Sequence, residues 1–186
     1  MRHISRLLGI SGSLRTQAFS KAILTALADA TAADATFEYA AIGELPHFDQ
    51  DLYAEPLPEA VARLRRQIAD ADGLVIASPE YNHGIPGVLK NALDWASRPH
   101  NASPLKGKPV LIVTSSPAST GGVRAQVQIR ETLVSALARP VNTPEIVVGH
   151  VATKIVDGRF TDAATIEFAR SGLAALFEAI AARTAS

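Results

Sequence analysis

The chain has 186 residues, of which 47% are hydrophobic and 19% are charged. At roughly 150 residues per domain this length predicts one domain over residues 1–186, with enough apolar material for a compact core. Eighteen Lys and Arg balance eighteen Asp and Glu, so no net positive charge favours nucleic acid or anionic lipid as a partner. The absence of cysteine excludes disulfides, thiolate metal ligands and thiol nucleophiles.

The N-terminal residues predict a strand rather than a targeting segment. Arg2 and Arg6 are followed by the short apolar run 7–10, which stops at a Ser-Gly-Ser turn and is far shorter than the apolar region of a signal peptide. No apolar stretch approaches the roughly 18 residues of a membrane span. We therefore expect a cytoplasmic protein without a membrane partner.

Short β-branched runs alternate with longer amphipathic segments along the chain. The runs are nearly all apolar, as expected for strands that are covered on both faces in a parallel sheet. The predicted strands are 6–11, 37–42, 74–78, 109–115 and 145–149. The predicted helices are 18–31, 57–71, 86–97, 122–138 and 163–183. A short β excursion is expected within residues 151–160, before the last helix.

This alternation predicts a three-layer, doubly wound α/β fold of flavodoxin type, with a five-stranded parallel sheet in the order 2-1-3-4-5. In such a fold, ligands bind beyond the carboxyl ends of the strands where the strand order reverses. Three loops are expected to meet there, at residues 11–17, 79–84 and 115–122. All three are rich in Gly, Ser, Pro or Asn, which expose backbone groups and short polar side chains.

The first loop has the composition of a phosphate-binding turn. Gly12 permits a close turn, Ser11, Ser13 and Thr16 offer hydroxyl groups, and Arg15 offers a guanidinium group for a phosphate dianion. The helix that follows presents its N–H groups and positive dipole end. The loop lacks both the GK[ST] ending of a P-loop and the G-x-G-x-x-G fingerprint. The alternative is a serine-rich turn that binds nothing.

The second and third loops suit a planar ligand. In the second, turn-forming residues surround Tyr81 and Asn82, and a stiff loop of this kind presents backbone groups to a heterocycle. The alternative is a turn in which Tyr81 covers the core, while His83 is either a general acid or a solvated side chain. The third loop ends in Gly121 and Gly122, which allow close backbone approach to a ligand.

Other catalytic arrangements are poorly supported. His47, Asp49 and Asp51 alternate, but no second cluster completes a metal shell, so no metal site is expected. No G-x-S-x-G or H-E-x-x-H pattern occurs, which counts against serine hydrolases and zinc proteases. Asp94 and Trp95 are expected to anchor the third helix against the sheet.

Four motifs together resemble the NAD(P)H-dependent FMN reductase family, which includes quinone, chromate and azo reductases. The resemblance spans about residues 5–150 and is carried by GSLR at 12–15, SPEYN at 78–82, KNALDW at 90–95 and GGVRAQ at 121–126. It implies FMN as cofactor, NAD(P)H as co-substrate and a small-molecule electron acceptor. It also implies a homodimer or homotetramer with the flavin near a subunit interface.

The resemblance also implies which residues bind the cofactor. The phosphate is assigned to the first loop and the isoalloxazine ring to the other two. The implied residues are Ser11, Ser13, Arg15, Ser20, Pro79, Glu80, Tyr81, Asn82, Ser116 and Gly121. The family's first loop commonly continues as Arg-x-x-Ser-x-Asn, whereas this chain has Ala18 and Ser20 at those two positions. Phosphate binding is therefore where this chain departs from the family.

These expectations combine into an FMN-dependent NAD(P)H oxidoreductase that reduces a quinone, an azo compound, free flavin or a similar acceptor. No catalytic side chain is assigned, because the flavin carries the chemistry and the protein orients it. One alternative is a flavodoxin-like electron carrier, against which the balanced charge counts, since carriers that dock on basic partners are usually acidic. Another is a flavin-free interaction domain on the same fold.

Overall fold

The structure is a computed structural model that describes residues 4–184. Within them, the helices are α1 (Phe19–Ala30), α2 (Glu59–Asp70), α3 (Gly87–Ala96), α4 (Val123–Ser135) and α5 (Ala163–Thr184). The strands are β1 (Ser5–Ser11), β2 (Ala35–Tyr39), β3 (Gly73–Pro79), β4 (Pro109–Ser115), β5 (Arg139–Pro140), β6 (Ile146–Val148), β7 (Ile155–Val156) and β8 (Arg159–Phe160).

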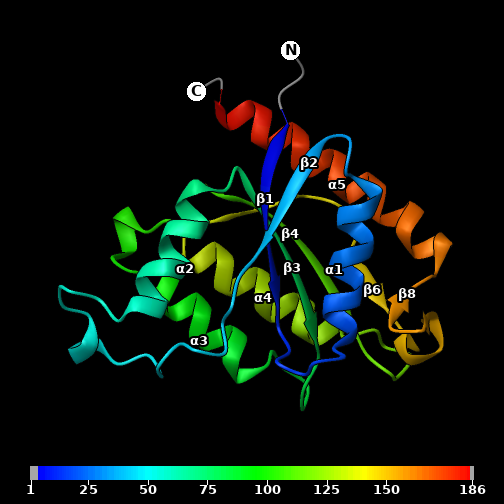
Figure 1. The fold of residues 1–186 in the computed structure, drawn as a ribbon, viewed down its shortest axis with the longest axis horizontal. Coiled ribbons are helices and arrows are strands. Elements are labelled where there is room, and N and C mark those ends of the chain that lie inside the picture. The colour runs from blue at the N-terminus through cyan, green and yellow to red at the C-terminus, as the bar shows by residue number, and fades with distance from the viewer. Residues whose placement is uncertain (1–3, 185–186) are drawn as a thin grey trace.

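The main sheet has the order that the sequence predicts. Its strands are parallel and run β2-β1-β3-β4-β5, with β6 also paired to β4. The order therefore reverses between β1 and β3. Figure 1 shows the loops that follow β1 and β3 at the lower end of the molecule, opposite the start of β1. The fold class is a doubly wound α/β domain of flavodoxin type, as expected.

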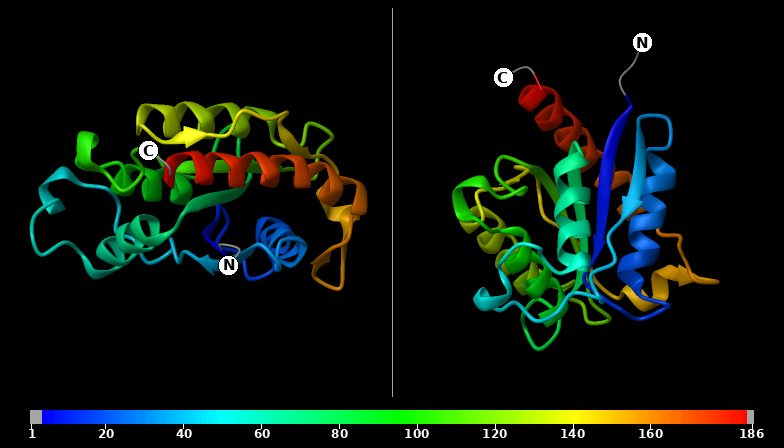
Figure 2. Two further views of the ribbon diagram at one scale, coloured as in Figure 1. Left: turned by 90° about the horizontal axis from the view of Figure 1, so that it is seen from above. Right: turned by 60° about the vertical axis from the view of Figure 1, so that its left-hand side comes forward.

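Alternating side chains of the central strands fill two cores, one on each face of the sheet. In β1, Leu8 and Ile10 pack with α2, α3 and α4, whereas Leu7 packs with α1 and α5. In β4, Ile112 and Leu111 divide in the same way. The view from above in Figure 2 shows α1 and α2 on opposite sides of the sheet. This double burial explains why the strand sequences are almost uniformly apolar.

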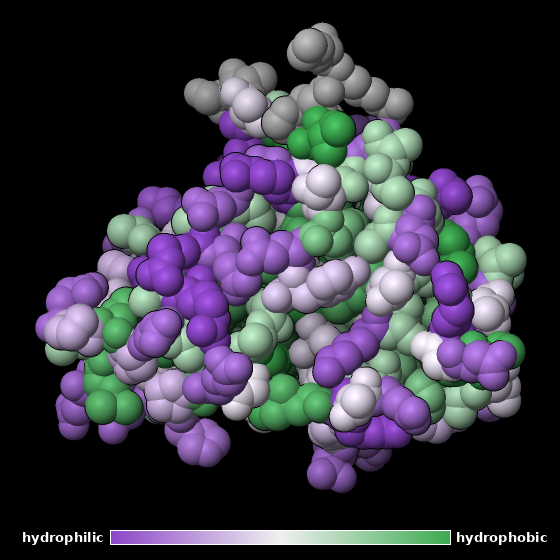
Figure 3. All heavy atoms as spheres, in the orientation of Figure 1, coloured by the Kyte–Doolittle hydropathy of each residue, from purple (hydrophilic) through white to green (hydrophobic). Residues whose placement is uncertain are grey.

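One edge of the sheet is formed by β2. Its Tyr39 ring lies over Gly9 of β1, where an added Cβ would come within 3.0 Å of the Tyr39 Cδ1 atom. Burial raises the pKa of the Tyr39 hydroxyl, partly opposed by a hydrogen bond with Thr25. In Figure 3 a paler, more apolar strip over β2 separates the hydrophilic residues over α1 and α2. The Tyr39 ring thus covers part of the sheet face beside this edge.

The predicted strand at 145–149 is found as β6 on the outer side of β4, where it pairs with the last three residues of β4. A second short strand, β5, was not predicted: Arg139 and Pro140 pair with the first residues of β4, and Val141 N–H donates to the Val110 carbonyl at 2.9 Å. Pro144 has no N–H group to donate to a ladder, and it lies where the chain runs outside the sheet between β5 and β6. The predicted excursion before α5 is confirmed as the β7–β8 hairpin, which turns at Asp157 and Gly158, both with positive φ.

Two expectations about the helices change. Trp95 does anchor α3, since it is fully buried and its Nε1–H donates to the Pro46 carbonyl at 2.8 Å. Asp94 does not: its carboxylate accepts bonds from Lys90 Nζ at 2.7 and 2.9 Å on a half-exposed surface. Helix α4 ends at Ser135 rather than at residue 138, because Leu137 adopts a φ of 63°, which a helix cannot continue.

Candidate functional site

The three loops predicted to converge do so at the carboxyl ends of β1, β3 and β4. Gly12 N–H donates to the Ala77 carbonyl at 2.8 Å, which holds the first loop to the end of β3. The Ser13 hydroxyl lies 3.4 Å from the Tyr81 hydroxyl, within hydrogen-bond reach, and joins the first loop to the second. Glu80 N–H donates to the Ser115 carbonyl at 3.3 Å and joins the second to the third.

Serine hydroxyls organise the first loop. The Oγ atoms of Ser11 and Ser20 lie 2.8 Å apart, so the end of β1 is tied to the first turn of α1. The Ser11 hydroxyl also donates to the Ser13 carbonyl at 3.0 Å. Gly12 is required here, because a Cβ would lie 2.3 Å from the Ser78 Oγ atom. The structure thus brings Ser11, Ser13 and Ser20 into one tight turn.

The start of α1 suits an anion. Its N-cap is Ala18, whose methyl group cannot accept a hydrogen bond from the first helical N–H groups. The Arg15 guanidinium lies 5.6 Å from the centre of the Phe19 ring, beside that helix end. Free N–H groups, serine hydroxyls and a guanidinium are the donors that a phosphate monoester needs, so this loop fits the phosphate of FMN.

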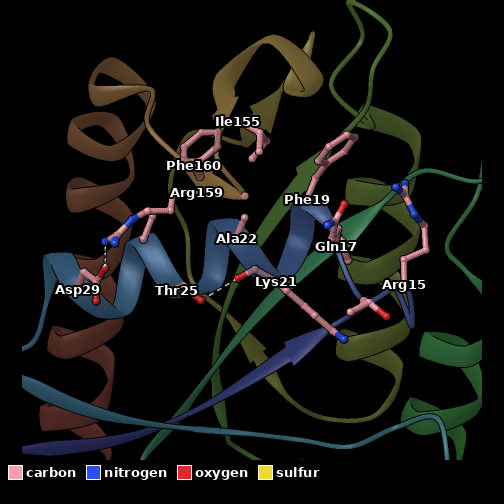
Figure 4. Close-up of a pocket in the computed structure, with 14 residues that line it drawn as sticks. Arg15, Gln17, Phe19, Lys21, Ala22, Thr25, Asp29, Ile155, Arg159 and Phe160 are labelled. Carbon is pink, nitrogen blue, oxygen red and sulfur yellow. Dashed lines mark hydrogen bonds and ion pairs between the residues drawn. The ribbon is translucent and has the colours of Figure 1, made fainter.

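A pocket of about 380 Å³ extends from this loop along α1 to the β7–β8 hairpin. Figure 4 shows Arg15 and Gln17 at one end, and Arg159 with Asp29 at the other, where the two charged groups lie 3.6 Å apart. The pocket is lined by Arg15, Thr16, Gln17, Ala18, Phe19, Lys21, Ala22, Thr25, Ala26, Asp29, Ile155, Gly158, Arg159 and Phe160. The hairpin therefore lines the part of the pocket that extends along α1, with Arg159 at the end away from Arg15.

The second loop is a tight hairpin. Tyr81 and Gly84 exchange two backbone hydrogen bonds of 2.9 Å, and Asn82 and His83 between them have φ values of 49° and 66°. Both values are positive, as in the type I′ turns that join antiparallel strands. The Tyr81 side chain is 47% exposed, so it does not cover the core. The tip formed by residues 81–84 is held stiffly with its side chains in solvent.

Residues on either side of this tip are bonded to α4. The Glu80 carboxylate accepts the N–H groups of Arg124 and Ala125 at 2.9 and 3.2 Å. On the other side, Ile85 N–H donates to Gln128 Oε1 at 3.0 Å. The sequence analysis missed Gln128, and assigned Glu80 to the flavin ring. Neither role has a local sequence signal, because both contacts join residues more than 40 positions apart.

The third loop is held by internal bonds. The Ser116 hydroxyl accepts the Ala118 N–H at 3.1 Å, and Ser116 N–H donates to the Val148 carbonyl at 3.0 Å. Gly121 is buried at a φ of 62°, and a Cβ there would lie 2.9 Å from the Val148 nitrogen. Packing against the end of β6 thus requires this glycine, in addition to any approach of a ligand.

The KNALDW motif holds the long loop between β2 and α2. Asn91 accepts the Phe48 N–H at 2.7 Å and donates to the Pro46 carbonyl at 2.9 Å. The Phe48 ring meets Trp95 edge to face, with ring centres 5.0 Å apart. The motif therefore anchors a loop that leaves the sheet at the same end as the three site loops.

The described residues contain no cluster of three His, Asp or Glu side chains that could hold a metal ion. None of the helices within residues 4–184 is long and apolar enough to cross a membrane. Fold and site together define a flavodoxin-like protein with a serine-rich turn that fits a phosphate group and a stiff second loop at the switch point of the sheet.

Comparison with known proteins identifies the family. The model of the NADPH-dependent FMN reductase family matches residues 5–153, so the chain belongs to that family. An NAD(P)H-dependent FMN reductase of Pseudomonas aeruginosa is 40% identical over 172 residues, which cover 92% of each chain. A 2-hydroxy-1,4-benzoquinone reductase of Burkholderia sp. is 42% identical over 146 residues, covering 78% of this chain and 79% of that protein.

A solved structure agrees with these relatives. The flavoenzyme NAD(P)H:(acceptor) oxidoreductase FerB from Paracoccus denitrificans matches with a TM-score of 0.85 and 31% identity, over 95% of this chain and 97% of that one. The predictions of the family and of an oxidoreductase that uses FMN and NAD(P)H are confirmed at the level of the family.

Proposed function

We propose that the protein is a single flavodoxin-like domain over residues 1–186 that binds FMN and passes hydride from NAD(P)H to a small-molecule acceptor. The acceptor class is a quinone, an azo compound, free flavin or a similar molecule. The observation that carries this proposal is the junction of the three loops: a serine-rich turn at the start of α1 lies beside a stiff, exposed hairpin at the switch point. The Burkholderia relative, which reduces a benzoquinone, supports the quinone class.

In this proposal the first loop binds the phosphate. Arg15 supplies the charge, the start of α1 supplies N–H groups, and the loop hydroxyls supply further hydrogen bonds. Ser11 and Ser20 shape the turn by bonding to each other. Ser13 lies between the phosphate turn and Tyr81, and so sets the spacing between the two halves of the cofactor site.

The second and third loops orient the ring. Pro79 ends β3, and the 81–84 tip presents Tyr81 and Asn82 at its exposed end. Ser116 and Gly121 shape the facing loop through their bonds and packing against β6. Bound FMN would supply the two-electron chemistry, accepting hydride from NAD(P)H and returning it to the acceptor. The protein holds and orients the ring without a dedicated acid or base.

We further propose a homodimer or homotetramer in the cytoplasm. Three exposed valines lie along α4, which follows the third loop: Val123, Val127 and Val134 are 37%, 45% and 58% exposed. A second copy packed on α4 would bury them and complete the wall of a site that the loops of one chain leave open. A cytoplasmic location fits an enzyme that draws on the intracellular pool of reduced pyridine nucleotides.

The cofactor can be tested directly. Purified protein reconstituted with excess FMN and FAD should release about one FMN per chain on heating, as identified by chromatography. Recovery of FAD alone, or of no flavin, would contradict the proposal. The electron carrier is the second candidate, and it differs in one respect: its bound flavin would not be reduced by NAD(P)H.

A further inference from the structure

The hairpin that follows β3 is attached at both ends to one helix. Glu80 immediately precedes the tip at residues 81–84, and its Oε2 atom accepts two N–H groups from the first turn of α4. Ile85 immediately follows the tip, and its N–H donates to Gln128 on the next turn of α4. The four residues between these two attachments have only each other as backbone partners across the turn.

The Glu80 attachment supplies what α4 lacks. The N-cap of α4 is Gly122, at a φ of 84°, and it has no side chain with which to accept the first N–H groups of the helix. A carboxylate at that helix end satisfies two of them and interacts favourably with the helix dipole. The Glu80 side chain is only 8% exposed, and the Arg124 guanidinium lies 3.6 Å from its other oxygen. The charge is therefore held in place and neutralised by α4.

This arrangement leaves little of Glu80 for a ligand. Its carboxylate is bonded to α4, and its N–H donates to the Ser115 carbonyl at 3.3 Å. The exposed groups of the loop are those of the tip itself, Tyr81 to Gly84. The backbone of the tip is thus held to α4 through Glu80 and Gln128, while the Tyr81 hydroxyl meets Ser13 of the first loop.

We propose that Glu80 and Gln128 are positioning residues that clamp the 81–84 tip to α4 and so fix the part of the site that meets the flavin ring. The inference rests on the proposed function, because it assigns the tip to the ring end of FMN. Neither residue has to touch the cofactor. Because the clamp already orders the tip in the flavin-free protein, the tip loses less conformational entropy when the flavin binds. Breaking the clamp should therefore weaken binding of the isoalloxazine ring and leave binding of the phosphate unchanged.

Matched pairs of variants separate the clamp from general destabilisation. Glu80→Ala and Gln128→Leu each remove an acceptor. Glu80→Gln and Gln128→Glu each keep an oxygen where the structure needs one. Because Oε2 of Glu80 accepts both α4 bonds, a single amide oxygen in Glu80→Gln can replace it. If Glu80→Ala fails to fold, Gln128→Leu still tests the clamp from the other side of the tip.

The measurement is a fluorescence titration of each flavin-free variant with FMN and with riboflavin, with melting temperatures to establish folding. We expect the two acceptor-removing variants to bind both flavins about 10-fold more weakly, with the FMN-to-riboflavin affinity ratio unchanged. The two acceptor-keeping variants should stay within about 3-fold of the wild type. In the flavin-free protein, the Ile85 amide proton should exchange at least about 10-fold faster in Gln128→Leu than in Gln128→Glu.

Two results would overturn the inference, and they are distinguishable. Wild-type protein that binds flavin, together with acceptor-removing variants that bind equally well, would show that the clamp does not position the ring end. Wild-type protein that binds neither flavin would overturn the proposed function and the inference with it.

Discussion

At the scale of single residues, we expect Arg15 to supply most of the ionic interaction with the phosphate in the proposed site, because the usual serine and asparagine of the family loop are replaced by Ala18 and Ser20. A hydrogen bond to a charged group contributes about 1.5–3 kcal/mol, so Arg15→Ala should weaken FMN binding about 10- to 100-fold. Riboflavin, which has no phosphate, should bind as it does to the wild type. Ser13→Ala is the control, and it should reduce FMN affinity less than Arg15→Ala does. If Arg15→Ala lost as much affinity for riboflavin as for FMN, the assignment of the phosphate to this loop would be wrong.

Ala18 provides a second test of the same loop. As the N-cap of α1 it accepts no hydrogen bond through its side chain, whereas serine is a preferred N-cap residue. Ala18→Ser should therefore stabilise the flavin-free protein by about 0.5–1 kcal/mol, and raise FMN affinity a few-fold if the hydroxyl also reaches the phosphate. Thermal unfolding with and without FMN measures both effects. An unchanged melting temperature without FMN would contradict the capping argument.

Gly121 tests the packing of the third loop. Gly121→Ala places a Cβ 2.9 Å from the Val148 nitrogen at a φ of 62°, whereas Gly107→Ala, at a φ of 69°, points into open space among the described residues. Both substitutions strain the backbone, and only the first also clashes. We expect Gly121→Ala to lower the free energy of unfolding by at least about 1 kcal/mol more than Gly107→Ala. Equal losses would show that β6 does not confine this loop.

Sequence reasoning located the site residues better than it assigned their roles. Ser11, Ser13 and Tyr81 do come together, because the carboxyl ends of adjacent parallel strands meet at one edge. The bonding of Glu80 to α4 and the need for Gly121 at β6 depend on which distant backbone lies nearby. Composition and spacing carry no such information.

At the scale of elements, Lys108 joins β4 to the end of α2. It is almost fully buried, and its Nζ donates to the Ala69 carbonyl at 3.1 Å and to the Ala71 carbonyl. Burial lowers the pKa of this lysine from 10.5 to about 8, with a further lowering from Arg183 opposed by Asp72 and Asp70 and assisted by Arg6. A neutral amine still has two hydrogens for the two carbonyls.

This pKa predicts a pH dependence of stability. Between pH 8 and 10.5 the unfolded chain binds a proton at Lys108 that the folded chain does not, so stability rises with pH across this window. Lys108→Met lacks that titration. From pH 7.5 to pH 10, the free energy of unfolding of the wild type should increase by about 2 kcal/mol relative to Lys108→Met, measured by urea denaturation. If the difference in free energy of unfolding between the wild type and Lys108→Met did not change with pH, Lys108 would have an ordinary pKa in the folded protein.

The elements themselves were largely predictable, and their deviations have local causes. Apolar runs identified β1, β3 and β4 because both faces of these strands are buried. The predicted strand 145–149 is found as β6, whereas the two-residue strand β5 was not predicted and α4 ends early at Leu137. A strand of two residues has no periodicity to detect, and nothing in the sequence marks Leu137 for a positive φ.

At the scale of the whole molecule, the proposed oligomeric state depends on the surface of the folded chain and not on any single motif. The exposed valines run along α4 from the third loop, so in the proposed oligomer a second chain that buries them would also reach the end of α4 at which the site lies. Light scattering of the protein at assay concentrations should give a dimer or tetramer of the 19.6 kDa chain. Val127→Lys should lower the measured molar mass, since the substitution introduces a charge into the proposed apolar contact. A fully active monomer would contradict the proposed assembly.

The proposed function is tested most sharply by reduction of the bound flavin with pyridine nucleotide. Protein reconstituted with FMN and held under argon should lose its yellow absorbance on addition of NADH or NADPH, and regain it when a benzoquinone is added, with hydroquinone formed in equal amount to the nucleotide consumed. If dithionite bleached the flavin but neither NADH nor NADPH did, the protein would not be an NAD(P)H-dependent enzyme. The electron carrier would then be the supported function.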